Sequence, residues 1–238
     1  MTRGFQLGSA LAKRRRALRL GLLLVRSEGF CAPDRIRVRN RRADLSLPRE
    51  HSVDVAFMEI LLADVYGLER VQRLDTILDV GAHVGLFTLA ASIVHPAARI
   101  HSYEPNIDLA QHLVRNTAGT GAVVYYEAVG ASDGRCDLET VGESVNTRVQ
   151  RSATGKVLVT AFRTAVQRLG GRVDFVKIDC EGSEWELLDD DDAWASVGHV
   201  SLEFHGDGAR AVRRLEELGF AVAQAETGTY GIVIADRA

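Results

Sequence analysis

Two short stretches in the second half of the chain place proton-accepting side chains at the ends of predicted strands. The stretch "FVKID" ends at Asp179 and is followed by Glu181, and "SLEFH" carries Glu203 and His205. Carboxylates and imidazoles can remove protons from hydroxyl groups, and a base whose pKa lies near the working pH does so best. We therefore predict a catalytic group of Asp179, Glu181, Glu203 and His205. His205 is the expected general base, with Asp179 or Glu203 orienting it or taking the role directly.

Each of these side chains also has an alternative interpretation. Together the four could hold Mg²⁺ or Mn²⁺, which would lower the pKa of a bound hydroxyl, but we favour a site without metal. Glu203 could be a buried, hydrogen-bonded carboxylate, His205 a strand-end histidine, and Asp179 the cap of a helix beginning near residue 183. Cys180 is disfavoured as a nucleophile because neighbouring carboxylates raise the pKa of a thiol.

The stretch "ILDVGAHVGLFTL" indicates a cofactor site. An apolar strand ends at Asp79 and is followed by Gly81 and Gly85, and open α/β sheets bind ligands beyond the carboxyl ends of their strands. A nicotinamide fingerprint needs glycine where this chain has His83 and Leu86, and no Gly-Lys-Ser/Thr follows for a P-loop. The negative charge of Asp79, next to glycines that let the backbone pass close to a ligand, suits the cationic amino-acid end of S-adenosylmethionine.

Glu104 completes this pattern, in the stretch "HSYEPN". It ends the next predicted strand, 19 residues after Gly85, where an acidic side chain can accept both ribose hydroxyls. The residues predicted to bind S-adenosylmethionine are Asp79, Gly81, Ala82, His83, Gly85, Glu104, Pro105 and Asp179.

The elements that must position these groups alternate between strand and helix, which predicts a mostly parallel α/β sheet. Only "ETGTYG" separates the last two strands, which is too short for a crossover helix and predicts an antiparallel hairpin. Helix is expected at 86–94, 107–117, 183–188 and 209–218, and over 53–67 with Ser52 as its cap. Strands are expected at 76–80, 98–103, 123–128, 173–179, 199–204, 221–225 and 231–235, with "CDLET" and "KVLVTAF" adding two more between 135 and 171.

Composition and charge divide the 238 residues into two parts. With 46% hydrophobic and 26% charged residues the chain can bury a full core, and we predict a main domain at 51–238. Residues 1–50 hold 13 of the 29 Lys and Arg residues and form a basic arm with a short hairpin, "RIRVRN" and "LSLPR". A helical stripe of Leu11, Leu18, Leu22 and Val25 favours packing on this domain or on a partner subunit, as in a homodimer, over covering an anionic substrate.

Composition also bears on partners and compartment. The arm lacks the aromatic residues of an RNA-binding surface, and no apolar run is long enough to span a bilayer, so we expect neither a nucleic-acid nor a membrane partner. Three cysteines at wide spacings, without a Cys/His cluster, predict reduced thiols and no zinc site. Without an export signal, we expect a cytoplasmic protein. Asp189–Asp192 is expected to be a solvated helix end.

The combination of "DVGAHVGLFTL", "YEPN", "VDFVKIDCEGSEWELL" and "LEFHG" resembles the FkbM family of S-adenosylmethionine-dependent methyltransferases, over roughly 49–235. The resemblance implies a Rossmann-like class I fold with seven strands. It also implies that Ala128 and Val129 border the adenine, and that the acceptor is a hydroxyl group on a sugar or natural product. The chain departs from the family at Phe162-Arg163, where members often have Leu-Asp, and in its basic arm.

The predicted function is therefore S-adenosylmethionine-dependent O-methylation of a small molecule in natural-product biosynthesis. N-methylation of an amine or guanidine is an alternative, because the acidic groups would bind a cationic acceptor. A protein that binds S-adenosylmethionine without catalysis is another. Asp79 and Glu104 would be kept by both an enzyme and a binder, whereas Asp179, Glu181 and His205 favour an enzyme.

Overall fold

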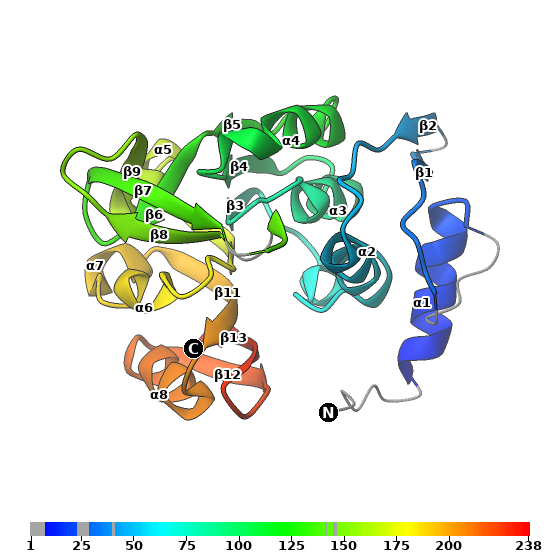
Figure 1. Cartoon of the computed structure of the whole chain (residues 1–238). Helices are drawn as coiled ribbons and strands as arrows, with labels where there is room; N and C mark the ends of the chain where they lie inside the picture. Colours follow the sequence, from blue (N-terminus) through cyan, green and yellow to red (C-terminus); the bar gives the residue numbers. More distant parts are fainter. Residues whose placement is uncertain (1–7, 23–28, 40, 141, 145–146) are drawn as a thin grey trace.

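A computed structural model describes residues 8–22, 29–39, 41–140, 142–144 and 147–238 (Figure 1). Its centre is a seven-stranded sheet in the order β12–β13–β11–β10–β3–β4–β5. Six strands are parallel, and β13 runs antiparallel to both of its neighbours, as the short final connection predicts. The strands are β3 (Thr76–Val80), β4 (Arg99–Tyr103), β5 (Val123–Tyr125), β10 (Val173–Ile178), β11 (Val197–His205), β12 (Phe220–Ala225) and β13 (Tyr230–Arg237).

Helices cover both faces of this sheet, because alternate side chains of its buried strands point to opposite sides. Ile77 and Phe175 belong to a core shared with α3 (Leu86–Val94). Leu78 and Val176 belong to a second core. The helices that contribute to the second core are α5 (Phe162–Arg168), α6 (Glu184–Leu187), α7 (Asp191–Trp194) and α8 (Gly208–Glu217). On the first face, α4 (Ala110–Thr117) follows the 3-10 turn η3 (Ile107–Leu109) and packs on α3.

The predicted strand at 123–128 is divided between two sheets. β5 ends at Tyr125 as the edge of the large sheet, and a second sheet in the order β6–β9–β7–β8 begins one residue later. "CDLET" and "KVLVTAF" fall in this second sheet, whereas β8 was not predicted because its short polar sequence has no apolar periodicity. Its strands are β6 (Glu127–Gly130), β7 (Gly134–Thr140), β8 (Thr147–Arg151) and β9 (Val157–Ala161).

The helix before β3 differs from the prediction at both ends. Its first part, α2 (His51–Phe57), is not capped by Ser52; instead the Glu143 carboxylate accepts two backbone N–H groups of its first turn, at 3.1 and 3.0 Å. The chain continues as a π-helix, η1 (Met58–Ala63). Asp64, in the left-handed region at φ 55°, ends it before the predicted glycine. A short 3-10 turn, η2 (Leu68–Arg70), then leads toward β3.

The basic arm packs on η1 through its helix α1 (Gly8–Arg19), at the right of Figure 1. Ala17 and Leu20 are buried there. Of the predicted stripe, Leu22 packs against the same core as α3, whereas Leu11 and Leu18 are each 59% exposed and do not. Val25, the last member of that stripe, lies outside the described residues.

The short hairpin after the arm is present, but its second strand comes earlier than predicted. β1 (Arg35–Val38) pairs with β2 (Arg41–Asp44), and "LSLPR" follows the hairpin without forming a strand. Ile36 of this hairpin is buried in the same core as α3. No helix that the structure describes is both long enough and apolar enough to cross a lipid bilayer.

The acidic run before α7 is more than a solvated helix end. Asp190 is buried, and its carboxylate accepts the backbone N–H of Ala193 at the start of the helix. It also accepts two hydrogen bonds from the guanidinium of Arg163, at 2.9 and 2.7 Å. Arg163, where the chain departs from the family, therefore has an acidic partner in Asp190, the residue directly before α7.

Candidate active site

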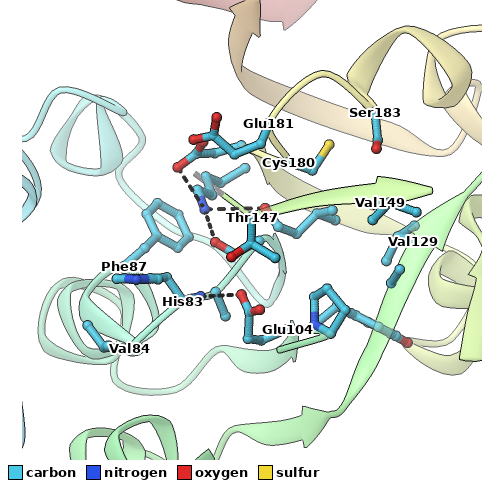
Figure 2. A pocket seen from close by; sticks show the side chains of 18 of the residues that line it. His83, Val84, Phe87, Glu104, Val129, Thr147, Val149, Cys180, Glu181 and Ser183 are labelled. Carbon is cyan, nitrogen blue, oxygen red and sulfur yellow. Dashed lines mark hydrogen bonds and ion pairs between the residues drawn. The ribbon is translucent and has the colours of Figure 1, made fainter. Parts of the chain in front are cut away.

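A pocket opens where the carboxyl ends of β3, β4 and β10 meet the second sheet, with about 880 Å³ of empty space including its open mouth. Figure 2 shows its wall, to which Phe87, Val129 and Val149 contribute apolar side chains. Of the residues predicted from the sequence, the wall contains Gly81, Ala82, His83, Glu104, Pro105, Ala128, Val129, Asp179 and Glu181. The predicted residues Asp79, Gly85, Glu203 and His205 do not line it.

The two glycines of the first motif have different roles. A Cβ atom at Gly81 would lie 1.8 Å from the backbone oxygen of Asp179, so only glycine lets the ends of β3 and β10 approach this closely. Gly85 is placed at the start of α3 with φ 83°, and a Cβ there would meet Leu113 and Thr117 at 2.9 Å. Gly85 therefore serves helix packing, unlike the cofactor contact expected for it.

Glu104 is held by backbone groups and faces the pocket. One of its oxygens accepts the N–H of His83 at 2.8 Å, and the other accepts the N–H of Asn106 at 2.8 Å. Burial raises the pKa of Glu104 to about 7, although these two hydrogen bonds oppose the shift. Each carboxylate oxygen has a second lone pair, so Glu104 can also accept hydroxyl groups of a ligand.

His83 joins this part of the pocket to the loop between β7 and β8. Its Nε2 lies 2.7 Å from the Ser144 hydroxyl oxygen, and Ser144 donates a hydrogen bond to Glu50 at 2.6 Å. Burial lowers the pKa of His83 to about 4, so its ring is neutral at pH 7. The backbone of His83 is left-handed, with φ 50°, which directs its N–H to Glu104.

Lys177 is a buried cation between two aspartates. Its Nζ lies 3.3 Å from Asp79 and 3.5 Å from Asp179, and it donates to the backbone oxygen of Val80 at 3.2 Å. Although burial disfavours its charge, the two aspartates raise the pKa of Lys177. Asp79 is fully buried and also accepts a hydrogen bond from Thr88 at 2.7 Å. It thus lies behind the pocket wall with its charge paired, unlike the expected contact with a cationic ligand.

Tyr66 connects Asp179 to Glu203. Its hydroxyl oxygen lies 2.9 Å from Oδ2 of Asp179 and 2.9 Å from Oε2 of Glu203. Tyr230 donates a hydrogen bond to the other oxygen of Glu203. Burial raises the pKa of Glu203 to about 8, and the charge of Asp179 adds to this shift. Glu203 is therefore part of a buried acidic cluster rather than of the pocket wall.

Glu181 is an acidic residue of the pocket wall, and His205 lies beside it. The two side chains are 3.4 Å apart, and His205 also faces the buried Glu184 carboxylate, 3.3 Å from its Nδ1. Burial raises the pKa of Glu181 to about 7, and the charge of Asp179 acts in the same direction. The Glu184 carboxylate raises the pKa of His205 to about 8 against the effect of burial. Near neutral pH, the pair can therefore gain and lose protons.

Several residues of the site were missed by the sequence analysis, namely Tyr66, Lys177, Glu184 and Tyr230. A signal existed for Lys177, because a lysine inside an otherwise apolar buried strand must find charged partners. The tyrosines come from segments with no catalytic motif, and only the fold brings them to Glu203.

Neither a metal site nor a reactive thiol emerges from the described residues. They contain no group of three or more His, Cys, Asp or Glu side chains that could hold a metal ion. In particular, Asp179, Glu181, Glu203 and His205 do not converge on one point, because Glu203 is bonded to tyrosines and His205 to glutamates. Burial raises the pKa of the Cys180 thiol well above its usual value, with Glu184 and Asp179 acting in the same direction. None of the three cysteines forms a disulfide.

The residues of the pocket wall fit the chemistry of S-adenosylmethionine. Glu104 presents free lone pairs for the ribose hydroxyls, and the apolar wall around Val129 suits a flat adenine ring. The strand ends that approach closely at Gly81, and the acidic side chains of Asp179 and Glu181, suit the cationic amino-acid end of S-adenosylmethionine. Strand order and pocket position together define a class I S-adenosylmethionine-dependent methyltransferase.

Comparison with known proteins agrees with this class. Residues 79–222, more than half of the chain, match the family model described as the methyltransferase FkbM domain. The chain therefore belongs to the FkbM methyltransferase family, as its motifs predict.

Individual relatives are more distant. "Methyltransferase 1" of Beauveria bassiana is 27% identical over 205 residues, which cover 72% of this chain and 82% of that protein. The AMB antimetabolite synthetase AmbE of Pseudomonas aeruginosa is 25% identical over 228 residues, covering 71% of this chain but only 11% of AmbE. The solved structure of the Methanococcus jannaschii fibrillarin pre-rRNA processing protein is 12% identical, covers 90% of this chain and 86% of its own, and has a TM-score of 0.50. That likeness shows the fold alone.

Proposed function

We propose that this enzyme methylates a hydroxyl group of a small specialised metabolite or sugar. The observation that carries the proposal is Glu181, an acid in the pocket wall whose pKa is raised to about 7 and which is paired with His205. Removal of a hydroxyl proton favours a base with a pKa near the working pH. Bound S-adenosylmethionine supplies an electrophilic methyl group, which leaves the protein to position the acceptor and remove its proton.

Glu181 takes this proton in our proposal, and His205 is a positioning residue. Both ring nitrogens of His205 face carboxylates, at 3.4 and 3.3 Å, so neither is available to an acceptor in the pocket. The imidazolium beside Glu181 favours its carboxylate form and orients it. The general-base role predicted for His205 from the sequence therefore passes to its neighbour.

The relatives support a role in specialised metabolism. AmbE carries in its name the synthesis of an antimetabolite, and a segment of it resembles this chain. Cysteines that form no disulfide suit the reducing environment of the cytoplasm. Neither observation identifies the acceptor, so the proposal extends only to its chemical class.

A second candidate is methylation of an amine or guanidine. The described part of the pocket wall contains the acids Glu104, Glu127, Asp179 and Glu181, whereas Lys177, its one Lys or Arg, is already paired with aspartates. Such a wall would attract a cationic acceptor and repel an anionic one. Deprotonated Glu181 would then bind the acceptor's charge instead of removing a proton.

The test is incubation of the protein with S-adenosylmethionine and panels of sugars, hydroxylated metabolites and amines. Mass spectrometry would detect a product heavier by one methylene unit, and NMR would place the new methyl group on oxygen or nitrogen. Methylation on nitrogen alone would favour the second candidate. If a hydroxyl is the acceptor, Glu181→Gln should lower turnover at saturating S-adenosylmethionine by roughly 10²- to 10⁴-fold. A Glu181→Gln enzyme with full turnover would rule out this base.

A further inference from the structure

A chain of hydrogen bonds leads from the pocket wall to the surface through Glu203. The Tyr66 hydroxyl oxygen lies 2.9 Å from a carboxylate oxygen of Asp179 and 2.9 Å from one of Glu203. Glu203 in turn accepts a hydrogen bond from Tyr230. Tyr66 is buried, Glu203 is 8% exposed and Tyr230 is 45% exposed. We refer to Asp179, Tyr66, Glu203 and Tyr230 as the acid cluster.

The acid cluster has one more hydrogen bond than its tyrosines can supply. Tyr230 uses its proton in donating to Glu203, and Tyr66 has one hydroxyl proton for two carboxyl groups. Tyr66 can donate to only one of its two carboxyl neighbours. In its other contact, a carboxylate oxygen would face a lone pair of the Tyr66 hydroxyl, unless that carboxyl group is protonated and donates to Tyr66. Three hydrogen bonds among these four side chains therefore require one extra proton.

The surroundings of the acid cluster agree with this count. Burial raises the pKa of the Tyr66 hydroxyl well above its usual value, so the tyrosine keeps its proton, and burial also raises the pKa of Glu203 to about 8. Lys177 on β10 faces Asp179 at 3.5 Å, but it also balances Asp79. Other titratable groups around the cluster are Cys180 and Glu181, which follow Asp179 in the chain, and His83, whose pKa the charge of Asp179 acts to raise. His205 also lies nearby, with its ring centre 5.3 Å from that of Tyr230.

We propose that the acid cluster holds one extra proton in the ligand-free enzyme and releases it when S-adenosylmethionine binds, but not when S-adenosylhomocysteine binds. In this step a carboxyl O–H bond breaks, its electron pair stays on the carboxylate, and the proton passes to solvent, which the cluster meets at Tyr230. The cluster gains one negative charge, which the positive charge of the bound cofactor would favour. The product has lost its methyl group and this positive charge, so it does not favour deprotonation.

Glu203, Tyr66 and Tyr230 would therefore make the pocket selective for the charged cofactor over its neutral product. Below the pKa of the cluster, the affinity for S-adenosylmethionine should rise by up to about tenfold per pH unit relative to that for S-adenosylhomocysteine. Above it, the ratio of the two affinities should be constant.

Calorimetric titration of both ligands at pH 7, in buffers with different ionisation enthalpies, measures the protons released on binding. The inference rests on the proposed binding of S-adenosylmethionine in this pocket. We expect about one more proton with S-adenosylmethionine than with S-adenosylhomocysteine. Both ligands carry the same ribose, so subtracting the two values removes any proton that Glu104 releases to the buffer when the ribose binds. This difference should vanish in Glu203→Gln, which has a similar shape but cannot ionise, and should fall in Tyr66→Phe.

Asp64→Asn is the matched comparison, because it removes an acid whose pKa is raised by burial but which lies outside both the acid cluster and the pocket wall. It should keep the difference in proton release. Equal release with the two ligands in the unmodified enzyme, or a difference that persists in Glu203→Gln, would overturn the inference while leaving the cofactor assignment intact. Absence of any S-adenosylmethionine binding would overturn both. If circular dichroism shows that Glu203→Gln does not fold, an unchanged difference in Tyr66→Phe is the overturning result.

Discussion

The two ends of the pocket are built in different ways. The cofactor end is formed mainly by backbone contacts. Gly81 allows the ends of two strands to approach, and the backbone N–H groups of His83 and Asn106 donate hydrogen bonds to Glu104. At the other end, side chains from distant segments meet, as where Tyr66 joins Asp179 to Glu203. The first end depends on local chain geometry, and the second on charges that must be paired across the fold.

This difference determines how each end should respond to change. A backbone-built site fails when an added atom blocks the close approach of two segments, whatever the pH. A site built from buried charges fails when one partner is removed, because the remaining charge has lost both water and its counter-ion. It should also respond to pH, since several of its carboxyl groups have raised pKa values.

The largest expected effect comes from Gly81→Ala at the backbone-built end. Its methyl group would lie 1.8 Å from the Asp179 backbone oxygen, in a residue with φ 78°. Overpacking and left-handed strain together should cost about 5 kcal/mol of unfolding free energy and weaken cofactor binding. Gly119→Ala is the control, because φ is 77° there and no atom lies within 4 Å of the added Cβ. Chemical denaturation should show a loss of only about 1 kcal/mol for the control; equal losses would mean that close approach is not what requires Gly81.

Removal of Lys177 tests the charge-built end. Lys177→Met leaves Asp79 and Asp179 buried without their cation, which should cost roughly 3–5 kcal/mol of unfolding free energy at pH 7. The loss should shrink in acid, where the aspartates can become neutral. As a control, Arg35→Met breaks an ion pair whose side chains are 58% and 77% exposed, and should cost about 0–1 kcal/mol. Denaturation curves of both variants that coincide at pH 7 would contradict the role assigned to the buried cation.

The same contrast explains what the sequence could predict. β3 lies where the apolar run at 76–80 places it, and the residues that follow it reach the pocket wall because they are its direct continuation. Glu104 was predictable for the same reason, since it ends the next strand. Features that depend only on chain order and strand ends are visible in a single sequence.

Groups that act through partners far along the chain were less visible. The role of His205 depends on Glu184, and that of Glu203 on Tyr66, 137 positions away. Asp79 carries the expected charge at the expected strand end, but only the structure shows that Lys177 already neutralises it. The π-helix η1 had no signal either, because its residues have the apolar pattern of an ordinary helix.

The pH dependence of stability tests buried carboxyl groups at both ends of the pocket. In the folded, ligand-free protein the pKa values of Glu104 and Glu181 are raised to about 7 and that of Glu203 to about 8, from 4.5. A raised carboxyl pKa means that the folded state holds its proton more tightly than the unfolded state. This stability is fully present below pH 4.5 and is lost as the pH rises through 7 to 8.

Thermal denaturation of the ligand-free protein should therefore show a lower Tm at pH 8 than at pH 6. Each glutamate should contribute on the order of 1 kcal/mol to this change. Glu203→Gln should reduce the fall in Tm because its carboxamide cannot ionise, whereas Gly119→Ala should keep the full fall. A Tm that stays constant or rises over this range would show that these carboxyl groups are not held in their neutral form.

The smallest effect on the pocket is expected from the basic arm. Arg16 donates hydrogen bonds to the backbone oxygens of Leu62 and Ala63 at 3.1 and 3.2 Å, near the end of η1, and to Glu69 at 2.9 Å. Because a helix end leaves carbonyl oxygens without helical partners, Arg16→Ala should cost about 1–2 kcal/mol of unfolding free energy. Exposed Arg15→Ala on the same helix should cost within about 0.5 kcal/mol.

Cofactor affinity should be unchanged in both arginine variants. The contacts of Arg16 lie at the end of η1, whereas the groups that fit the cofactor follow β3, β4 and β10. One residue of η1, Ile60, does line the pocket, so the arm has a physical route by which it could affect binding. Calorimetry at a temperature where both variants are folded separates the two effects. Weaker S-adenosylmethionine binding in Arg16→Ala but not in Arg15→Ala would show that the arm supports the pocket through Ile60, and that the cofactor end also depends on a distant segment.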